Sequence, residues 1–121
     1  MKSNQTQPLG QGGKPYSDYK SVDVLLTTTG DTDIYTTDWE RAQVRMHYTN
    51  TDASTRLVSI YRIPVGYPSD VSYQILKTVE LLAGEHAWEP STLYLNPGYK
   101  IVAKADAANV VVVHAEVDYQ V

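Results

Sequence analysis

Residues 96–119 read NPGYKIVAKADAANVVVVHAEVDY, and this stretch decides the fold. It opens with a turn, because Pro97 fixes φ and Gly98 can adopt the positive φ that a type II turn needs at its third position. In residues 99–105 apolar side chains then recur with a period of two, as in a half-buried strand. After a polar break at 106–109, a second run places one set of side chains on a common face: Val111, Val113, Ala115, Val117 and Tyr119. The stretch predicts a β-hairpin.

The remainder of the chain repeats this kind of pattern. Further short strands are predicted near residues 22–27, 32–37, 41–48, 56–63, 71–79, 87–88 and 93–95. The clearest alternation falls in 41–48, and with 56–63 it predicts a second hairpin across a loop of turn-forming residues. Residues 71–82 also match helical spacing, but their Val, Tyr and Thr favour a strand. About nine short strands without a clear helix predict an all-β protein, an antiparallel β-sandwich of jelly-roll-like type.

Length and composition exclude several classes of protein. The chain has 121 residues, of which 42% are hydrophobic, and this fits one domain with a modest core. It has no cysteine, so it can form neither disulfides nor thiolate metal sites. A net charge of −4 argues against a general nucleic-acid binder, which is usually basic. No apolar run approaches the roughly 20 residues of a membrane span, and no signal-peptide core follows Met1, so we expect synthesis in the cytoplasm and no membrane partner.

The first twenty residues differ from the rest. Residues 1–20 are rich in Gln, Gly, Ser and Pro, and they cannot bury enough surface to offset the entropy lost on ordering. We therefore predict a flexible N-terminal arm at 1–20 and a single β-sandwich domain at 21–121. Three lysines against one aspartate give the arm a charge of +2, whereas the other residues carry seven basic and thirteen acidic side chains. The arm residues expected to contact a partner are Lys14, Tyr16 and Tyr19, although an ordinary disordered terminus fits equally well.

Polar residues of catalytic or metal-binding type are present but lack the required spacing. His47, His86 and His114 show no ligand pattern, which favours ordinary histidines on a sheet surface. The acidic loop residues lack the glycine and the terminal glutamate of an EF-hand, which favours solvated turn acids: Asp31, Asp33, Asp38 and Glu40. Neither a G-x-S-x-G elbow nor a phosphate-binding glycine loop after a strand occurs. Paired carboxylates for glycoside cleavage stay open, but the chain is short for a deep cleft. We predict no catalytic residues, no metal ligands, no cofactor and no enzymatic activity.

Aromatic residues are the remaining candidates for binding. The chain has ten tyrosines and no phenylalanine, and tyrosine suits both pleated sheet surfaces and contact surfaces. Trp39, Tyr67 and Trp88 could form a platform for a sugar or a protein partner, although packing in the core is an alternative for each.

The order of motifs resembles a known class of protein. The segments that carry this are DIYTT (33–37), AQVRMHYTNTDAS (42–54), RLVSIYRIP (56–64), YQILKTVELLAGEHAWEP (73–90) and LYLNPGYKIVAKADAANVVVVHAEVDY (93–119). Over about residues 22–119 the chain resembles small all-β virion proteins of tailed bacteriophages, in which a T-x-x-Y-T start precedes an apolar strand ending in N-T. An L-x-x-G-x-x-I-x-x-x-A strand then precedes a Val-rich last strand. The N-terminal arm lies outside the resemblance.

The resemblance implies a structural role in a virion. The expected function is a capsid decoration or cement protein, or a neck, tail or fibre-base accessory, and that class has no catalytic residues to transfer. The implied partners are further copies of the chain, with a trimer favoured, and the major capsid protein or another virion protein. One alternative is a carbohydrate-binding β-sandwich for host attachment, which would use Trp39, Tyr67 or Trp88. A small hydrolase has the least support.

Overall fold

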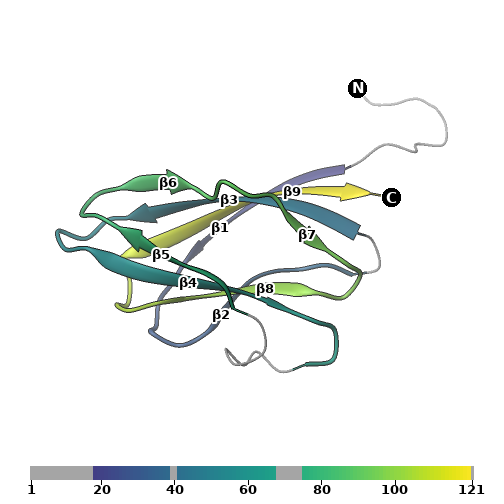
Figure 1. Ribbon diagram of the computed structural model, residues 1–121, viewed down its shortest axis with the longest axis horizontal. Coiled ribbons are helices and arrows are strands. Elements are labelled where there is room, and N and C mark those ends of the chain that lie inside the picture. Colours follow the sequence, from purple (N-terminus) through teal and green to yellow (C-terminus); the bar gives the residue numbers. More distant parts are fainter. Residues whose placement is uncertain (1–17, 39–40, 68–74, 121) are drawn as a thin grey trace.

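The computed structural model describes residues 18–38, 41–67 and 75–120, which form nine strands and no helix (Figure 1). The strands are β1 (Asp18–Leu25), β2 (Thr32–Thr36), β3 (Arg41–Asn50), β4 (Arg56–Ile63), β5 (Ile75–Leu81), β6 (His86–Trp88), β7 (Leu93–Leu95), β8 (Lys100–Ala105) and β9 (Val111–Gln120). All pairings between them are antiparallel. The predicted all-β fold is confirmed. Within these ranges, a helix of the length and apolarity needed to cross a membrane is not found.

The strands form two stacked sheets (Figure 1). Sheet A has the order β1-β9-β3, and both β6 and β7 pair with the other side of β3. Sheet B has the order β2-β8-β4-β5. Since β6 pairs with residues 47–49 and β7 with residues 42–44 of β3, they act as one interrupted edge strand. With β6 and β7 counted as one strand, the two sheets have four strands each, as in an eight-stranded jelly roll, so the predicted jelly-roll-like sandwich is also confirmed.

Both predicted hairpins are wrong. β8 pairs with β2 and β4 in sheet B, whereas β9 pairs with β1 and β3 in sheet A. In the same way β3 belongs to sheet A and β4 to sheet B. The loops at 51–55 and 106–110 therefore cross between sheets. A period of two shows which face of a strand is buried, but two strands facing the same core from opposite sheets give the same pattern as two paired strands.

The core lies between the sheets and follows the predicted faces. In β3 the inward residues are buried, namely Ala42, Val44, Met46 and Tyr48, and in β9 they are Val111, Val113, Ala115 and Val117. In β2 a register shift between Asp33 and Tyr35 allows the consecutive residues Ile34 and Tyr35 both to enter the core. A bulge of this kind reverses the side-chain alternation locally, which a strict period of two does not predict.

Three sequence predictions concern boundaries and turns. Gly98 has φ of 83°, and the Tyr99 N–H donates to the Asn96 carbonyl at 3.1 Å, so the predicted turn is confirmed. The run predicted as a strand at 71–79 is a strand from Ile75 onward, while residues 68–74 lie outside the described ranges. β1 begins at Asp18, inside the stretch assigned to the arm. Residues 1–17 are not described, so the flexibility of the arm stays a prediction.

Asn50 connects the end of sheet A to sheet B. Its side chain is fully buried, and its Nδ2 donates to the carbonyls of Ser54 at 2.9 Å, Leu81 at 3.1 Å and Leu82 at 3.1 Å. Its Oδ1 accepts the backbone N–H of Asp52 at 2.9 Å. Both Nδ2 hydrogens and one of the two acceptor positions of Oδ1 are thus engaged, as burial of a polar group requires. A residue that reads as a loop former in the sequence therefore holds the crossing between the sheets.

Candidate interaction face

The outer surface of sheet A gathers polar and aromatic side chains in rows across the strands. One row runs from Asp23 on β1 through His114 and His47 to Trp88 on β6, because each residue lies opposite the next in the strand register. In the neighbouring rows Glu116 lies opposite Arg45, and His86 lies opposite Thr49. We call the outward residues of these rows the histidine face: Asp23, Arg45, His47, His86, Trp88, His114 and Glu116.

His114 is held between two carboxylates. Its Nδ1 lies 2.6 Å from Asp23 Oδ1, and its Nε2 lies 3.4 Å from Glu116 Oε2. The hydrogen bond to Asp23 raises the pKa of His114 above its usual value, which outweighs the opposing effect of partial burial. The imidazole is therefore biased toward its charged form, with both ring nitrogens engaged.

His47 lies opposite His114, but its pKa is shifted in the opposite direction. Its ring stacks on that of His86, with centroids 5.7 Å apart and planes at 20°, and it is tilted by 58° against Trp88 at 4.9 Å. Partial burial, followed by the nearby His86 and His114, lowers the pKa of His47. The two opposed histidines therefore differ in their affinity for a proton, which is lower at His47 and higher at His114.

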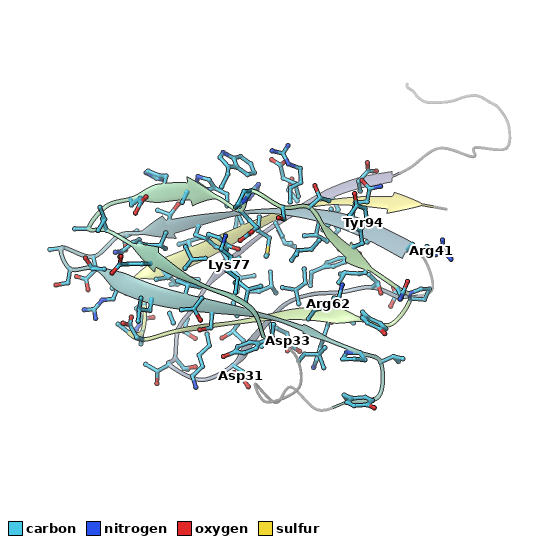
Figure 2. All side chains as sticks on the ribbon, viewed as in Figure 1. Asp31, Asp33, Arg41, Arg62, Lys77 and Tyr94 are labelled. Atoms are coloured by element: carbon cyan, nitrogen blue, oxygen red, sulfur yellow. The ribbon has the colours of Figure 1, made fainter. Side chains whose placement is uncertain are left out.

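Aromatic surface lies exposed beside these histidines. Trp88 is 48% exposed, and the Arg45 guanidinium lies 5.0 Å from the centroid of its ring, which is a cation–π contact. Tyr94 on β7 lies opposite Gln43 and is 62% exposed (Figure 2). Large aromatic side chains at half exposure, next to charged groups, are typical of surfaces that contact other molecules.

Although the three histidines share one face, they do not form a metal site. His86 Nδ1 lies 3.1 Å from Thr49 Oγ1, and both nitrogens of His114 contact carboxylates. Stacked rings such as those of His47 and His86 do not aim their lone pairs at a common point. Among the residues with described positions, three or more His, Asp or Glu side chains with a geometry that could hold a metal ion do not occur together.

The acidic loop residues are dispersed on the surface. Asp31, Asp33 and Asp38 are exposed, and Asp33 Oδ1 lies 3.5 Å from Lys100 Nζ (Figure 2). Glu40 lies outside the described ranges.

A small cavity of about 270 Å³ opens between the sheets at the β5 edge. Its lining combines an apolar floor with a polar mouth: Met46, Ile60, Leu93, Lys77, Glu89 and Ser91. The Glu89 side chain is 7% exposed, accepts the Tyr48 hydroxyl at 3.0 Å and lies 3.5 Å from Lys77 Nζ. Burial and the Glu89 charge raise the pKa of Tyr48 far above its usual value. Among the described lining residues Glu89 is the one carboxylate, so those residues do not supply the pair of carboxylates that glycoside cleavage requires.

The structure places only some of the predicted site residues. Trp88 lies on the histidine face, whereas Tyr67, 52% exposed, follows β4 in the turn that begins at Pro64. That segment and β6 lie at opposite ends of the sandwich, so these two residues do not form one site (Figure 1). Tyr19 pairs with Asp118 through the backbone, and its side chain is not described. Lys14, Tyr16 and Trp39 lie outside the described ranges.

The histidine cluster was not predicted. The alternation of side chains along β3 shows that His47 lies on its outward face. The sequence does not show which residues of β6 and β9 lie beside His47. Those contacts depend on which strands pair, and strand partners far apart in the chain leave no local signal.

Comparison with known proteins shows a likeness in fold. Neither a family model nor a curated protein matches the chain. A solved chain from Bacillus, described by the words "Bacillus endospore appendages form a novel family of disulfide-linked pili", aligns with a TM-score of 0.55 and 12% sequence identity. The alignment covers 97% of this chain and 99% of that chain. The chain is thus similar, over nearly its whole length, to a small all-β pilus protein of endospore appendages.

Proposed function

We propose that the chain is a non-enzymatic structural subunit that associates with copies of itself and attaches to a larger particle. The observation that carries the proposal is the alignment over 97% of this chain with a pilus protein, because a pilus is built from repeated protein subunits. That relative is described as disulfide-linked, whereas this chain has no cysteine. Its assembly would therefore depend on non-covalent contacts between folded domains.

The particle that we propose is a tailed-phage virion. Support comes from the motif order over residues 22–119, with a capsid decoration or cement protein as the favoured role and a neck or tail accessory as the other form. The partners would be further copies, with a trimer favoured, and the major capsid protein. Lys14 and Tyr16 of the arm, together with Tyr19 at the start of β1, would contact the shell or a neighbouring copy, since an extended segment can add a strand to an open sheet edge. Repeated weak contacts on a symmetric lattice give durable attachment.

The non-enzymatic part of the proposal is supported by how the polar groups are engaged. His114 is held by two carboxylates, and Glu89 is held by Tyr48 and Lys77. Such contacts leave these groups oriented toward each other and not toward a substrate, whereas a general base needs a free position near the proton that it removes.

Immunogold electron microscopy tests the proposal. An antibody against the purified chain is applied to cultures and lysates of the source organism, and labelling of phage shells or tails is expected. Labelling of cell or spore appendages would indicate that the chain belongs to a pilus and not to a virion. Diffuse label in the soluble fraction would contradict a structural role. Deletion of residues 1–17, which leaves β1 intact, should reduce particle binding if the arm takes part.

A carbohydrate-binding module is the second candidate, favoured by the exposed Trp88 and Tyr94 on one side of sheet A. Arg45 and His47 already contact the Trp88 ring, which leaves less of it for a sugar. A glycan array would show binding that Trp88→Ala abolishes and that Tyr67→Ala retains. A blank array for the unmodified chain would exclude this alternative.

A further inference from the structure

We propose that the histidine face is the surface through which two copies of this chain pair, about a two-fold axis parallel to the strands. The inference rests on the proposed self-association and names one surface that would take part in it. A trimer closes through contacts between unlike surfaces, whereas a two-fold contact joins the same surface on both copies. The pairing proposed here is therefore separate from any trimer contact.

The charges on the outer side of sheet A are divided into two halves. The half made by β1 and β9 carries Asp23, Glu116 and Asp118. The half made by β3 carries Arg41 and Arg45. An acidic half directly beside a basic half is complementary to its own rotated copy, because each half then faces the opposite charge.

The strand register makes this complementarity specific to residues. The two-fold axis lies above the outer side of sheet A, midway between β9 and β3 and parallel to both. Rotation about it places each β9 residue over a β3 residue of the partner copy. That β3 residue is the one with which the β9 residue is paired in the register of its own sheet. Glu116 lies opposite Arg45 within the chain, so Glu116 comes over the partner's Arg45, and this contact occurs twice. The same rotation places His114 over the partner's His47.

The exposed tryptophan fits the same arrangement. Trp88 and Asp23 end the row that contains His47 and His114, so the rotation brings Trp88 over the partner's Asp23. The indole N–H is a donor and a carboxylate an acceptor, which makes this an acceptable contact at the rim. Trp88 and Arg45 are both exposed, and Trp and Arg are among the residue types that most often dominate binding energy at interfaces.

The size of the face is sufficient for a modest association. β3 has 10 residues. At roughly 3.3 Å per residue and about 4.8 Å between strands, four strands present on the order of 600 Å² per copy. The total of about 1,200 Å² for both copies is at the lower end of specific interfaces. Face-to-face packing of aligned sheets is a common arrangement, so the fold itself presents no obstacle.

Reciprocal charge reversal tests the surface, with sedimentation velocity of the full chain from about 1 to 200 µM, the range of a modest interface. The unmodified chain is expected to form dimers as concentration rises. Arg45→Glu and Glu116→Arg should each weaken dimerisation about tenfold or more, because like charges then meet twice. An equal mixture of the two variants should dimerise again, because each acidic copy meets a basic one. Lys104→Glu, on the exposed outer side of sheet B, is the matched control and should dimerise normally.

Each outcome decides the inference. Dimers that persist in both single variants, or a mixture that fails to recover, would overturn pairing through this face while leaving self-association through another surface intact. A chain that stays monomeric over the whole range would also overturn it, and immunogold labelling would then judge the structural role separately. Circular dichroism verifies folding, and Arg45→Gln with Glu116→Gln replaces any reversal that fails to fold, with a smaller loss expected.

Discussion

Replacement of Asn50 by alanine is expected to destabilise the fold more than any substitution of a surface polar residue. The change removes three donated hydrogen bonds and one accepted bond from a fully buried position. It also leaves the Leu81 carbonyl, to which Asn50 donates inside the core, without that donor. The substitution therefore weakens the crossing from sheet A to sheet B and the end of β5 together.

The magnitude follows from these four bonds. A typical hydrogen bond contributes about 1 kcal/mol net, and a buried group left unsatisfied costs about 1–3 kcal/mol. Because the Ser54 and Leu82 carbonyls are only partly buried, water can replace part of their loss. We expect a decrease of about 3–4 kcal/mol in the free energy of unfolding. For a domain of 121 residues, whose total is on the order of 6–18 kcal/mol, this is a large fraction.

Urea unfolding followed by tryptophan fluorescence measures the effect, with an unchanged m-value as the sign that both states keep their compactness. Thr51→Val, which removes one exposed hydrogen bond to the Val110 carbonyl, is the matched control and should cost less than about 1 kcal/mol. Asn50→Asp should be worse than alanine at neutral pH, since a carboxylate would face three carbonyls. Burial raises the folded-state pKa of that carboxyl, so this variant should regain stability as pH falls. A loss below about 1.5 kcal/mol for Asn50→Ala would refute the reasoning.

Three further substitutions or titrations test other features. Gly98→Ala should cost more than Gly84→Ala in thermal unfolding, since both have positive φ but only the first would bring a Cβ within 2.8 Å of another side chain. Histidine NMR should show a pKa for His114 above its usual value, and Asp23→Asn should lower it. Because the pKa of His114 is raised in the folded state, its contact with Asp23 stabilises the fold at pH values below the unfolded-state pKa. This stabilisation is lost as pH rises through the folded-state pKa of His114, so a free energy of unfolding that does not change over this pH range would contradict the prediction. Tyr48→Phe should cost about 1–2 kcal/mol in urea unfolding, because it removes a donor from a largely buried carboxylate.

The sequence predicted what depends on neighbouring residues. The faces of β3 and β9 followed from alternation, and the turn at Gly98 followed from the need for positive φ. Which strands pair did not follow, because pairing is a contact between distant segments, and the predicted hairpins therefore proved to be crossings between sheets. The role of Asn50 was missed for a similar reason, since its partners Leu81, at the end of β5, and Leu82 are distant in the chain.

For the candidate site too, single residues could be predicted from the sequence, but their grouping could not. Trp88 was selected because large aromatic residues suit contact surfaces, and it does lie exposed on sheet A. Its neighbours His47 and Arg45 are brought to it by the pairing of β3 with β6. Single-residue chemistry can be read from a sequence, whereas a cluster requires the strand order.

The position of β9 has a consequence for how the protein folds. β9 lies between β1 and β3 and pairs with both along nearly their whole lengths, yet it is synthesised after both of them. Until it emerges, β1 and β3 have unpaired edges, and such edges recruit strands from other molecules. Sheet A therefore closes late and through long-range contacts, a topology that folds slowly. A nascent chain interrupted before residue 111 is expected to aggregate, whereas one that includes β9 can complete both sheets.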